Sequence, residues 1–324
     1  MYTNKIFDIQ SDDDFLHAAI ETFRYQYEHI SVYREFCDLL KTEPSQVKEI
    51  QDIPFLPIEI FKSHKVIAEN RKAQTVFVSS GTTGQITSRH YVADLHLYER
   101  SFTHGFNRVY GLASNYTILA LLPSYLERKG SSLIYMVNHL IEQSSNPHSG
   151  FYLNEIEALA QKLRFLEKQG QKTLLIGVSY ALLDLIEMET FDLKNTVIME
   201  TGGMKGRRKE LVKAEFHNLL KEGFGVQKIH SEYGMTELLS QAYSTGDGIF
   251  QNPPWMKILT RDTEDARSYV SGKTGGINVI DLANIYSCAF IATQDLGRAY
   301  DDNRFEILGR FSSSDVRGCN LLVL

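Results

Sequence analysis

The sequence is poor in features that mark secreted, zinc-binding or membrane-spanning proteins. It has three cysteines in 324 residues, Cys37, Cys288 and Cys319, and they are far apart. Their odd number and spacing predict neither a disulfide framework nor a CxxC zinc site. No apolar run approaches the roughly 18 to 20 residues that span a bilayer, and the first residues contain no signal-peptide core. We therefore expect a cytoplasmic protein without a membrane span.

The chain also lacks an excess of basic residues. Lysine and arginine together number 34, against 40 acidic residues, and the formal net charge is −6. Nucleic-acid binders usually carry a basic excess, so we expect no nucleic-acid partner. The hydrophobic share of 43% and the charged share of 23% are ordinary for a folded protein. The length suits one large domain or two modest ones.

Short apolar runs alternate with amphipathic stretches from residue 75 onward. The pattern predicts strands at 75–78, 116–122, 173–178, 196–200, 276–282 and 289–293, and helices at 181–187 and about 207–221. This alternation indicates α/β layers with largely parallel sheets. Before it, Ser11 and the three following aspartates predict the start of a helix over 11–41. We expect residues 1–74 to form a helical segment packed on a main domain at 75–324.

A loop of six small residues follows the first of these strands. It reads Ser79, Ser80, Gly81, Thr82, Thr83 and Gly84. Such a loop can bring backbone N–H groups and several hydroxyl donors close to an anion, and a polyphosphate is the expected guest. An ordinary flexible turn is the alternative. It is not a Walker A loop, because no Gly-Lys-Ser/Thr ending is present.

The segment from His230 to Glu237 carries a second group of candidates. Glu237 is a candidate Mg²⁺ ligand, because Mg²⁺ prefers oxygen ligands and commonly joins a carboxylate to substrate phosphates. Thr236 is placed to donate to a phosphate, and Tyr233, before Gly234, is placed to stack on a base. The alternative is a turn with a solvated glutamate. We expect His230 to be structural.

Two charged residues near the end of the sequence complete the set. Asp295 is predicted at the end of a strand, before a glycine turn, where it would accept hydrogen bonds from a ribose. A cap or turn role is the alternative. Arg310 would reach a ribose or phosphate oxygen through its fork of donors, or form a surface ion pair.

The order of these features resembles the adenylate-forming superfamily of acyl-CoA ligases. The resemblance implies that Ser79–Gly84 is the phosphate loop and that Gly202, Gly203 and Met204 line the adenine pocket. It also assigns Tyr233–Glu237 to adenine stacking and Mg²⁺, Asp295 to the ribose, and Arg310 to the hinge. ATP and Mg²⁺ are the cofactors it implies, and the fold is that of the superfamily's N-terminal domain.

A narrower resemblance is to the acyl-protein synthetase (LuxE) family, with phenylacetate-CoA ligases more distant. It rests on the segments 52–57, 122–127, 200–206 and 314–319. That family activates a fatty acid with ATP and passes the acyl group to a cysteine near its own C-terminus, which implies Cys319. The thiol follows Arg317, whose charge would favour a thiolate; a small apolar residue in a final strand is the alternative. We expect Cys37 and Cys288 to be core residues.

Two departures from the superfamily pattern stand out. Thr87 occupies the position where many members have a lysine after the phosphate loop, and the given sequence stops six residues after Gly318. The larger ligases continue there into a lid domain that carries a catalytic lysine. We therefore expect a fold without this lid, with charge stabilisation from Mg²⁺, Arg310, a partner subunit or a second copy of the chain.

The predicted activity is synthesis of an acyl-AMP from a carboxylic acid, followed by transfer to a protein cysteine. An acyl reductase or transferase subunit is the expected partner, and a homo-oligomer is a further expectation. One alternative is an acyl- or aryl-CoA ligase. A second is a non-catalytic nucleotide-binding partner of a reductase or transferase.

Overall fold

The structure is a computed structural model that describes residues 5–80, 86–123, 130–153, 155–203, 211–265 and 268–311. Within these ranges the chain divides into two compact units. The first comprises residues 1–102, 235–241 and 251–324, and the second comprises 103–234 and 242–250. The division groups residues 1–102 with later parts of the chain and places no boundary at residue 74. The boundary predicted there stays a prediction.

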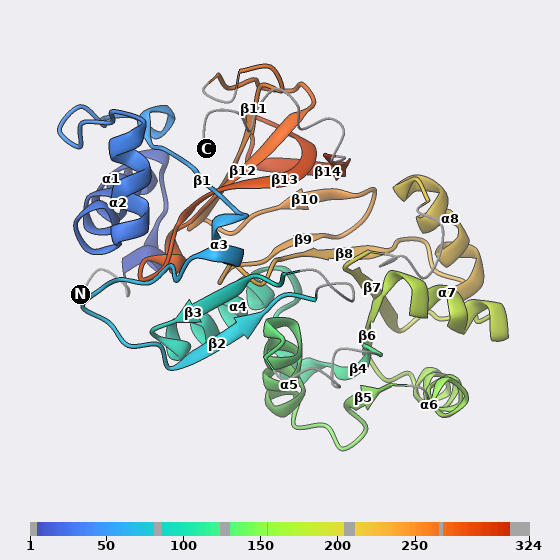
Figure 1. Ribbon diagram of the computed structural model, residues 1–324. Coiled ribbons are helices and arrows are strands. Elements are labelled where there is room, and N and C mark those ends of the chain that lie inside the picture. Colours follow the sequence, from blue (N-terminus) through green and yellow to red (C-terminus); the bar gives the residue numbers. More distant parts are fainter. Residues whose placement is uncertain are drawn as a thin grey trace. The chain divides into compact units, whose positions relative to one another are not determined.

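The first unit combines an antiparallel sheet with N-terminal helices (Figure 1). Its sheet has the strand order β11-β12-β13-β14, with β1 parallel to β13, and β2 and β3 form a separate hairpin. The elements are η1 (Lys5–Asp8), α1 (Asp12–His29), α2 (Ser31–Leu39), η2 (Ile50–Asp52), β1 (Leu56–Pro57), α3 (Ile60–Ser63), β2 (Thr75–Val78), β3 (Arg89–Val92), the start of α4 (Leu95–Tyr110), β11 (Met256–Arg261), β12 (Gly275–Asp281), η4 (Leu282–Asn284), β13 (Phe290–Ala299) and β14 (Arg304–Arg310).

The predicted helix over 11–41 starts as expected but is two helices. Ser11 caps α1 by accepting from the N–H of Asp14, and the Asp14 carboxylate accepts from the N–H of Ser11 in return. The helix then ends at His29, and the residue after it, Ile30, is extended (φ −116°, ψ 97°). This break folds the chain back so that Tyr33 of α2 packs edge-on against Phe23 of α1, with ring centroids 6.1 Å apart.

A buried amide holds α1 to the sheet of the first unit. The side chain of Gln26 is fully buried. It donates to the carbonyls of Asn284 and Ile285 at 3.0 and 2.9 Å and accepts from the N–H of Ala289 at 3.1 Å. Because three backbone groups of the sheet side share this one buried side chain, α1 is part of the unit's core and not an appendage.

The second unit is a mostly parallel sheet covered on both faces. Its strand order is β10-β9-β8-β7-β6-β4-β5, parallel from β8 to β5 and antiparallel at β8–β9. Its elements are the end of α4, η3 (Ala113–Asn115), β4 (Thr117–Leu121), α5 (Ser132–Ser144), β5 (Gly150–Tyr152), α6 (Ile156–Lys168), β6 (Thr173–Val178), α7 (Ser179–Met188), β7 (Thr196–Thr201), α8 (Lys213–Phe224), β8 (His230–Tyr233), β9 (Ala242–Ser244) and β10 (Ile249–Gln251).

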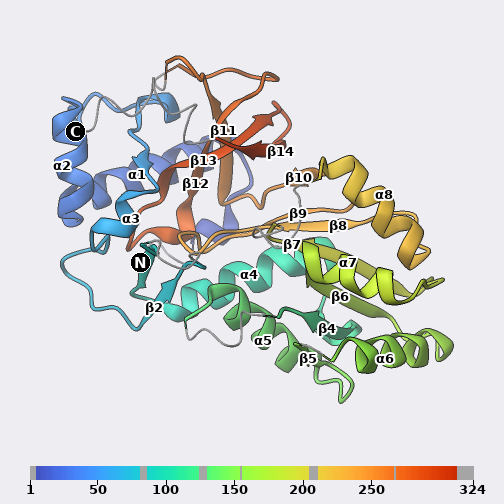
Figure 2. The same cartoon turned by 45° about the vertical axis from the view of Figure 1, so that its right-hand side comes forward.

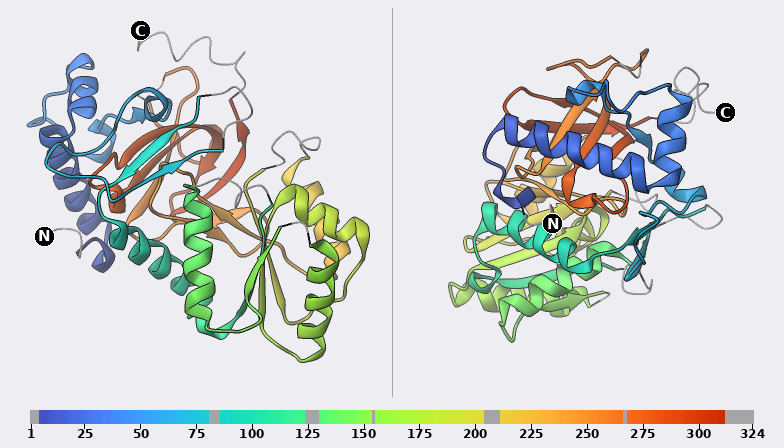
Figure 3. Two further views of the ribbon diagram at one scale, coloured as in Figure 1. Left: turned by 60° about the horizontal axis from the view of Figure 1, so that its bottom comes forward. Right: turned by 90° about the vertical axis from the view of Figure 1, so that its left-hand side faces the viewer.

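The helices of this unit follow from the strand order. The connection from β4 to β5 runs one way along the sheet and the later connections run the other way, so right-handed crossovers put α5 on one face and α6 on the other. The left view of Figure 3 shows the strands between these two helices. Figure 2 shows α7 and α8 side by side next to β6 and β7. The described residues contain no helix that is both long and apolar enough to cross a membrane.

The predicted α/β class is confirmed, with three corrections. Most parallel pairing lies in the second unit, since the sheet of the first unit is antiparallel apart from the β1–β13 pair. The helix predicted from about residue 207 begins at Lys213, after an extended Val212. Asp295 does not end a strand, because β13 continues through it and Gly297 to Ala299. A glycine is required at position 297 because the neighbouring strand comes so close that a Cβ there would lie 2.2 Å from the carbonyl oxygen of Glu306.

Candidate active site

The predicted phosphate loop connects the two strands of the β2–β3 hairpin. Below the loop, the N–H of Ser79 donates to the carbonyl of Ser88 at 3.1 Å, and the N–H of Ser88 donates to Oγ of Ser79 at 2.9 Å. These bonds extend the pairing beyond Val78 and fix the base of the loop. Ser80 is exposed, and Gly81, Thr82, Thr83 and Gly84 lie outside the described residues.

The segment that carries Thr236 and Glu237 is held by buried polar side chains of the first unit. A ring nitrogen of His90 lies 2.8 Å from the carbonyl oxygen of Thr236, and Nδ2 of Asn284 donates to the carbonyl of Glu237 at 2.7 Å. The Asp281 carboxylate accepts from the N–H groups of Leu239 and Ser240 at 2.7 and 2.9 Å, and from the Ser240 hydroxyl. The backbone on both sides of Glu237 is therefore fixed in place by side chains of the same unit.

Glu237 is buried, not solvated. The residue is 5% exposed, and burial raises the pKa of its carboxyl. A hydrogen bond from the Ser88 side chain and the positive charges of Arg310 and Lys62 act in the opposite direction on this pKa. A buried acid whose pKa responds to two cationic side chains is a typical functional-site arrangement. Ser88 also links the carboxylate of Glu237 to the base of the predicted phosphate loop.

Asp295 and Arg310 are brought together across β13 and β14. They are cross-strand partners, and Nε of Arg310 lies 2.9 Å from Oδ1 of Asp295. The Asp295 side chain is 6% exposed, whereas that of Arg310 is 73% exposed. Both predicted residues therefore occupy one place in the first unit, with the guanidinium on the solvent side. The ion pair offered as an alternative for Arg310 is present.

Lys62 was not predicted, and the structure puts it in the same electrostatic environment. It lies in the short helix α3, where the neighbouring Phe61 is buried and packs edge-on against His90 with centroids 5.9 Å apart. The strand before α3 pairs with β13, and the side chain of Gln294 donates to Glu59. These contacts hold α3 beside the segment that carries Glu237.

The other supporting residues missed by sequence reasoning are Ser88, His90, Asp281 and Asn284. They contact Glu237 or its neighbours from positions more than 40 residues away in the chain. No motif marks them, because they act through side-chain contacts that only the fold creates. The one sequence signal for Lys62 is its position shortly after the 52–57 segment.

The donor set fits one Mg²⁺ ion held partly by substrate. Within the described ranges no group of three or more His, Cys, Asp or Glu side chains is arranged to hold a metal. Mg²⁺ in nucleotide enzymes commonly uses one or two carboxylates together with phosphate oxygens and water. A nearby divalent cation would also favour the charged form of a carboxyl whose pKa is raised by burial.

The predicted adenine-side residues belong to the second unit. Gly202 follows the last residue of β7 in a left-handed conformation (φ 67°), and its carbonyl accepts from the Ser179 hydroxyl at 3.0 Å. Gly203 is exposed, as is Gly234, and Met204 lies outside the described residues. Tyr233 ends β8 and is largely buried, with its ring 5.8 Å from that of Phe250.

The three cysteines separate into two core residues and one that is not described. Cys37 and Cys288 are fully buried, and burial raises the pKa of the Cys37 thiol to about 12. Burial also raises the pKa of Cys288, so neither thiol readily forms a thiolate. The prediction that both are core residues is confirmed. Cys319 lies outside the described residues.

Comparison with known proteins identifies the family. Residues 8–324 match the family of acyl-protein synthetases, LuxE. The chain belongs to the LuxE family. The long-chain-fatty-acid–luciferin-component ligase of Aliivibrio fischeri is 24% identical over 328 residues, which cover 93% of this chain and 85% of that protein. The ligase of the same name from Photorhabdus luminescens is 35% identical over 67 residues, which cover 20% of this chain and 57% of that one.

Solved structures confirm the adenylate-forming fold of this LuxE-family chain. A 2-hydroxyisobutyryl-CoA ligase, in an open conformation with 2-HIB-AMP and CoA, superimposes with a TM-score of 0.69 at 13% identity, covering 93% of this chain and 70% of that one. ATP-bound MatB from Rhodopseudomonas palustris gives a TM-score of 0.55 at 17% identity, covering 72% of this chain. The chain matches about half the length of MatB, 47%. At these identities the likeness establishes the fold alone. Membership of the LuxE family confirms the predicted ligase class.

Proposed function

We propose that this chain activates a carboxylic acid, most simply a fatty acid, with ATP and transfers the acyl group to a protein thiol. In the first step the carboxylate attacks the α-phosphorus of ATP, the bond to the bridging oxygen of the β-phosphate breaks, and acyl-AMP and pyrophosphate form. The observation that carries the proposal is the buried Glu237, whose carboxyl is hydrogen-bonded by Ser88 at the base of the predicted phosphate loop and is influenced by the charges of Arg310 and Lys62.

Each charged residue of the candidate site in the first unit has a role in this proposal. Glu237 would hold Mg²⁺, which supplies positive charge to the phosphates when it is bound. Thr236 would donate to a phosphate from a backbone that His90 keeps in position. Arg310 and Lys62 would offset negative charge on the leaving pyrophosphate, while Asp295 accepts from the ribose and orients Arg310.

The loop Ser79–Gly84 and the adenine-side residues Gly202, Gly203, Met204, Tyr233 and Gly234 stay predictions. What supports them is the fixed base of the loop and the left-handed turn after β7. A glycine accepts the positive φ at Gly202 without strain and leaves the backbone open to close approach by a base.

Acid-dependent exchange of labelled pyrophosphate into ATP tests the first step. The assay uses purified protein, Mg²⁺ and a series of acids of increasing chain length. Exchange that requires one of these acids supports the proposal. Absence of exchange with every acid, alone or with an added acyl reductase or transferase partner, overturns it.

The second step forms a thioester on Cys319, with release of AMP. Intact-protein mass after incubation with ATP, Mg²⁺ and the active acid is expected to rise by one acyl group. Cys319→Ser should keep pyrophosphate exchange and lose the mass increase, whereas Cys37→Ser should keep both because that thiol is buried. Retention of the acyl group by Cys319→Ser would exclude this thiol as the acceptor.

The identity of the acyl acceptor distinguishes the proposed activity from the alternative functions. Turnover that depends on coenzyme A and survives Cys319→Ser would identify an acyl-CoA ligase. Nucleotide binding without adenylate formation would identify a non-catalytic partner of a reductase or transferase. Native mass spectrometry, with and without such a partner, tests the expected homo-oligomer.

A further inference from the structure

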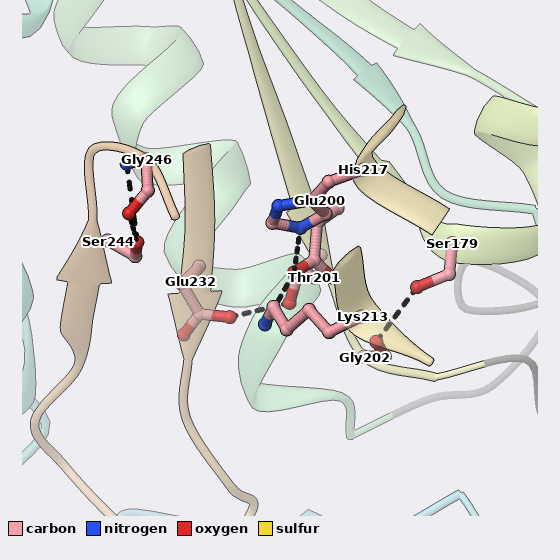
Figure 4. A network of polar contacts seen from close by, with 9 residues as sticks. All are labelled: Ser179, Glu200, Thr201, Gly202, Lys213, His217, Glu232, Ser244 and Gly246. Atoms are coloured by element: carbon pink, nitrogen blue, oxygen red, sulfur yellow. Dashed lines mark hydrogen bonds and ion pairs between the residues drawn. The ribbon is translucent and has the colours of Figure 1, made fainter. Parts of the chain in front are cut away.

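Two buried carboxyl groups lie on neighbouring parallel strands of the second unit. Glu200 and Thr201 end β7, and the register pairs Thr201 with Glu232 on β8. Glu200 and Glu232 are both nearly inaccessible, at 5% and 8% exposure. Figure 4 shows the two acids in one polar network, with Lys213 and His217 beside Glu200 and the Glu232 carboxylate turned toward Thr201.

The charge of Glu200 is balanced by neighbouring side chains, so a structural role explains this residue. Nζ of Lys213 lies 2.9 Å from its carboxylate and Nε2 of His217 lies 3.5 Å away. Although burial acts to raise it, these partners lower the pKa of Glu200 to about 2. Lys213 is further fixed above the ring of Phe250, 4.7 Å from its centroid. The Lys213 ammonium therefore interacts with Glu200 and with the ring of Phe250.

Glu232 has a different environment. Its Oε2 accepts from the Thr201 hydroxyl at 2.5 Å. No ion pair joins Glu232 to a lysine, arginine or histidine in the part of the chain that the structure describes. Burial and the charge of Glu200 raise the pKa of Glu232 to about 7. A buried acid supported by one hydroxyl destabilises the folded state relative to an apolar side chain, so a structural role does not explain it.

Both residues of the Thr201–Glu232 pair lie where a ligand is expected. Thr201 is followed by the Gly202–Gly203 turn and Glu232 by Tyr233, all at the carboxyl ends of adjacent parallel strands. In open parallel sheets ligands bind outside these carboxyl ends. Two acids whose surroundings separate their pKa values are typical of a functional site.

We propose that Glu232, oriented by Thr201, accepts a hydrogen bond from an N–H or O–H of the bound ligand and so selects ligands that carry this donor. The inference rests on the proposed function and goes beyond it. Thr201 occupies one acceptor position of the carboxyl and leaves the others for the ligand. A ligand without the donor leaves a buried acceptor unpaired, which corresponds to a loss of about tenfold or more in kcat/KM.

Two groups could supply the donor, and they are tested separately. One is the 6-amino group of adenine, tested by comparing ATP with purine riboside triphosphate, which lacks that group. The other is a hydroxyl or amino substituent on the acid, tested with straight-chain acids and their hydroxylated or aminated counterparts of equal length. Selection of at least tenfold in one comparison supports the proposal. Equal kcat/KM values within twofold in both comparisons overturn it.

Variants connect the selection to this pair. Glu232→Met removes the acceptor at similar volume and should bring the preference to about one. Glu232→Gln keeps an acceptor oxygen and should retain part of the preference. Glu222→Gln, on the exposed side of α8, should leave it unchanged. A preference that survives in folded Glu232→Met overturns the proposal; if that variant does not fold, Thr201→Val should weaken the preference, and an unchanged ratio there counts equally against it.

Binding measured by calorimetry keeps this inference separate from the proposed function. If no acid supports pyrophosphate exchange, the activity is wrong, but unequal binding of the paired nucleotides or paired acids still supports a donor-selecting Glu232. Equal binding in both pairs overturns the inference whether or not the enzyme turns over.

Discussion

Replacing Glu232 with glutamine should change how the stability of the protein depends on pH. The pKa of Glu232 is raised from 4.5 to about 7, mainly by burial and further by the charge of Glu200. Between these two pH values the unfolded chain releases the proton while the folded protein keeps it. Stability from this group is therefore complete below pH 4.5 and is lost as the pH rises through 7.

The expected size follows from the shift. Each pKa unit corresponds to about 1.4 kcal/mol, so a shift from 4.5 to about 7 amounts to roughly 3 kcal/mol over the whole range. Between pH 5 and pH 8 the part that changes is roughly 2 to 3 kcal/mol. Glutamine does not titrate, so Glu232→Gln should gain this amount relative to the parent protein as the pH rises.

Urea unfolding of both proteins at pH 5 and pH 8 measures the effect. The quantity compared is the difference in unfolding free energy between variant and parent at each pH, which cancels groups that titrate in both. Glu222→Gln, the same substitution at an exposed position of α8, is measured beside it as the matched control. A Glu232→Gln difference that changes by less than about 0.5 kcal/mol would refute the assigned burial and charge effects.

Three further changes test the candidate site. Lys62→Ala should lower the rate of pyrophosphate exchange by about tenfold to a hundredfold, with partial rescue by arginine and no effect from Lys65→Ala, whose ammonium lies over Tyr91; equal loss in both alanine variants would contradict a specific role. Asp281→Ala leaves the buried N–H groups of Leu239 and Ser240 unpaired and should reduce the unfolding free energy by at least about 2 kcal/mol. An unchanged urea midpoint would contradict a stabilising role of Asp281. The double change Thr82→Ala and Thr83→Ala should lower exchange at least tenfold without changing the melting temperature, and full activity would disprove the phosphate-loop assignment.

The sequence predicted the site where short motifs carry the chemistry. Tyr233–Glu237, Asp295 and Arg310 were found from residue type and order, and the structure brings Asp295 and Arg310 into contact. The strand position of Asp295 was wrong because a glycine after an aspartate usually signals a turn, whereas Gly297 allows close approach of β14 instead. The solvated alternative for Glu237 was wrong because the residue is buried, in a segment whose backbone is bonded by Asp281 and Asn284, which are distant in sequence.

The sequence by itself determined the family, the alternation of strands and helices, and the residue types that we predict to contact nucleotide and metal, because these depend on local pattern and on motif order. Only the tertiary structure decided which side chains change one another's charge. The charge of Lys62 influences the pKa of Glu237, and the charge of Glu200 influences the pKa of Glu232. In both pairs the residues are distant in sequence, so no local pattern predicts the interaction. Burial and charge proximity arise from long-range contacts, and these exist only after the chain has folded.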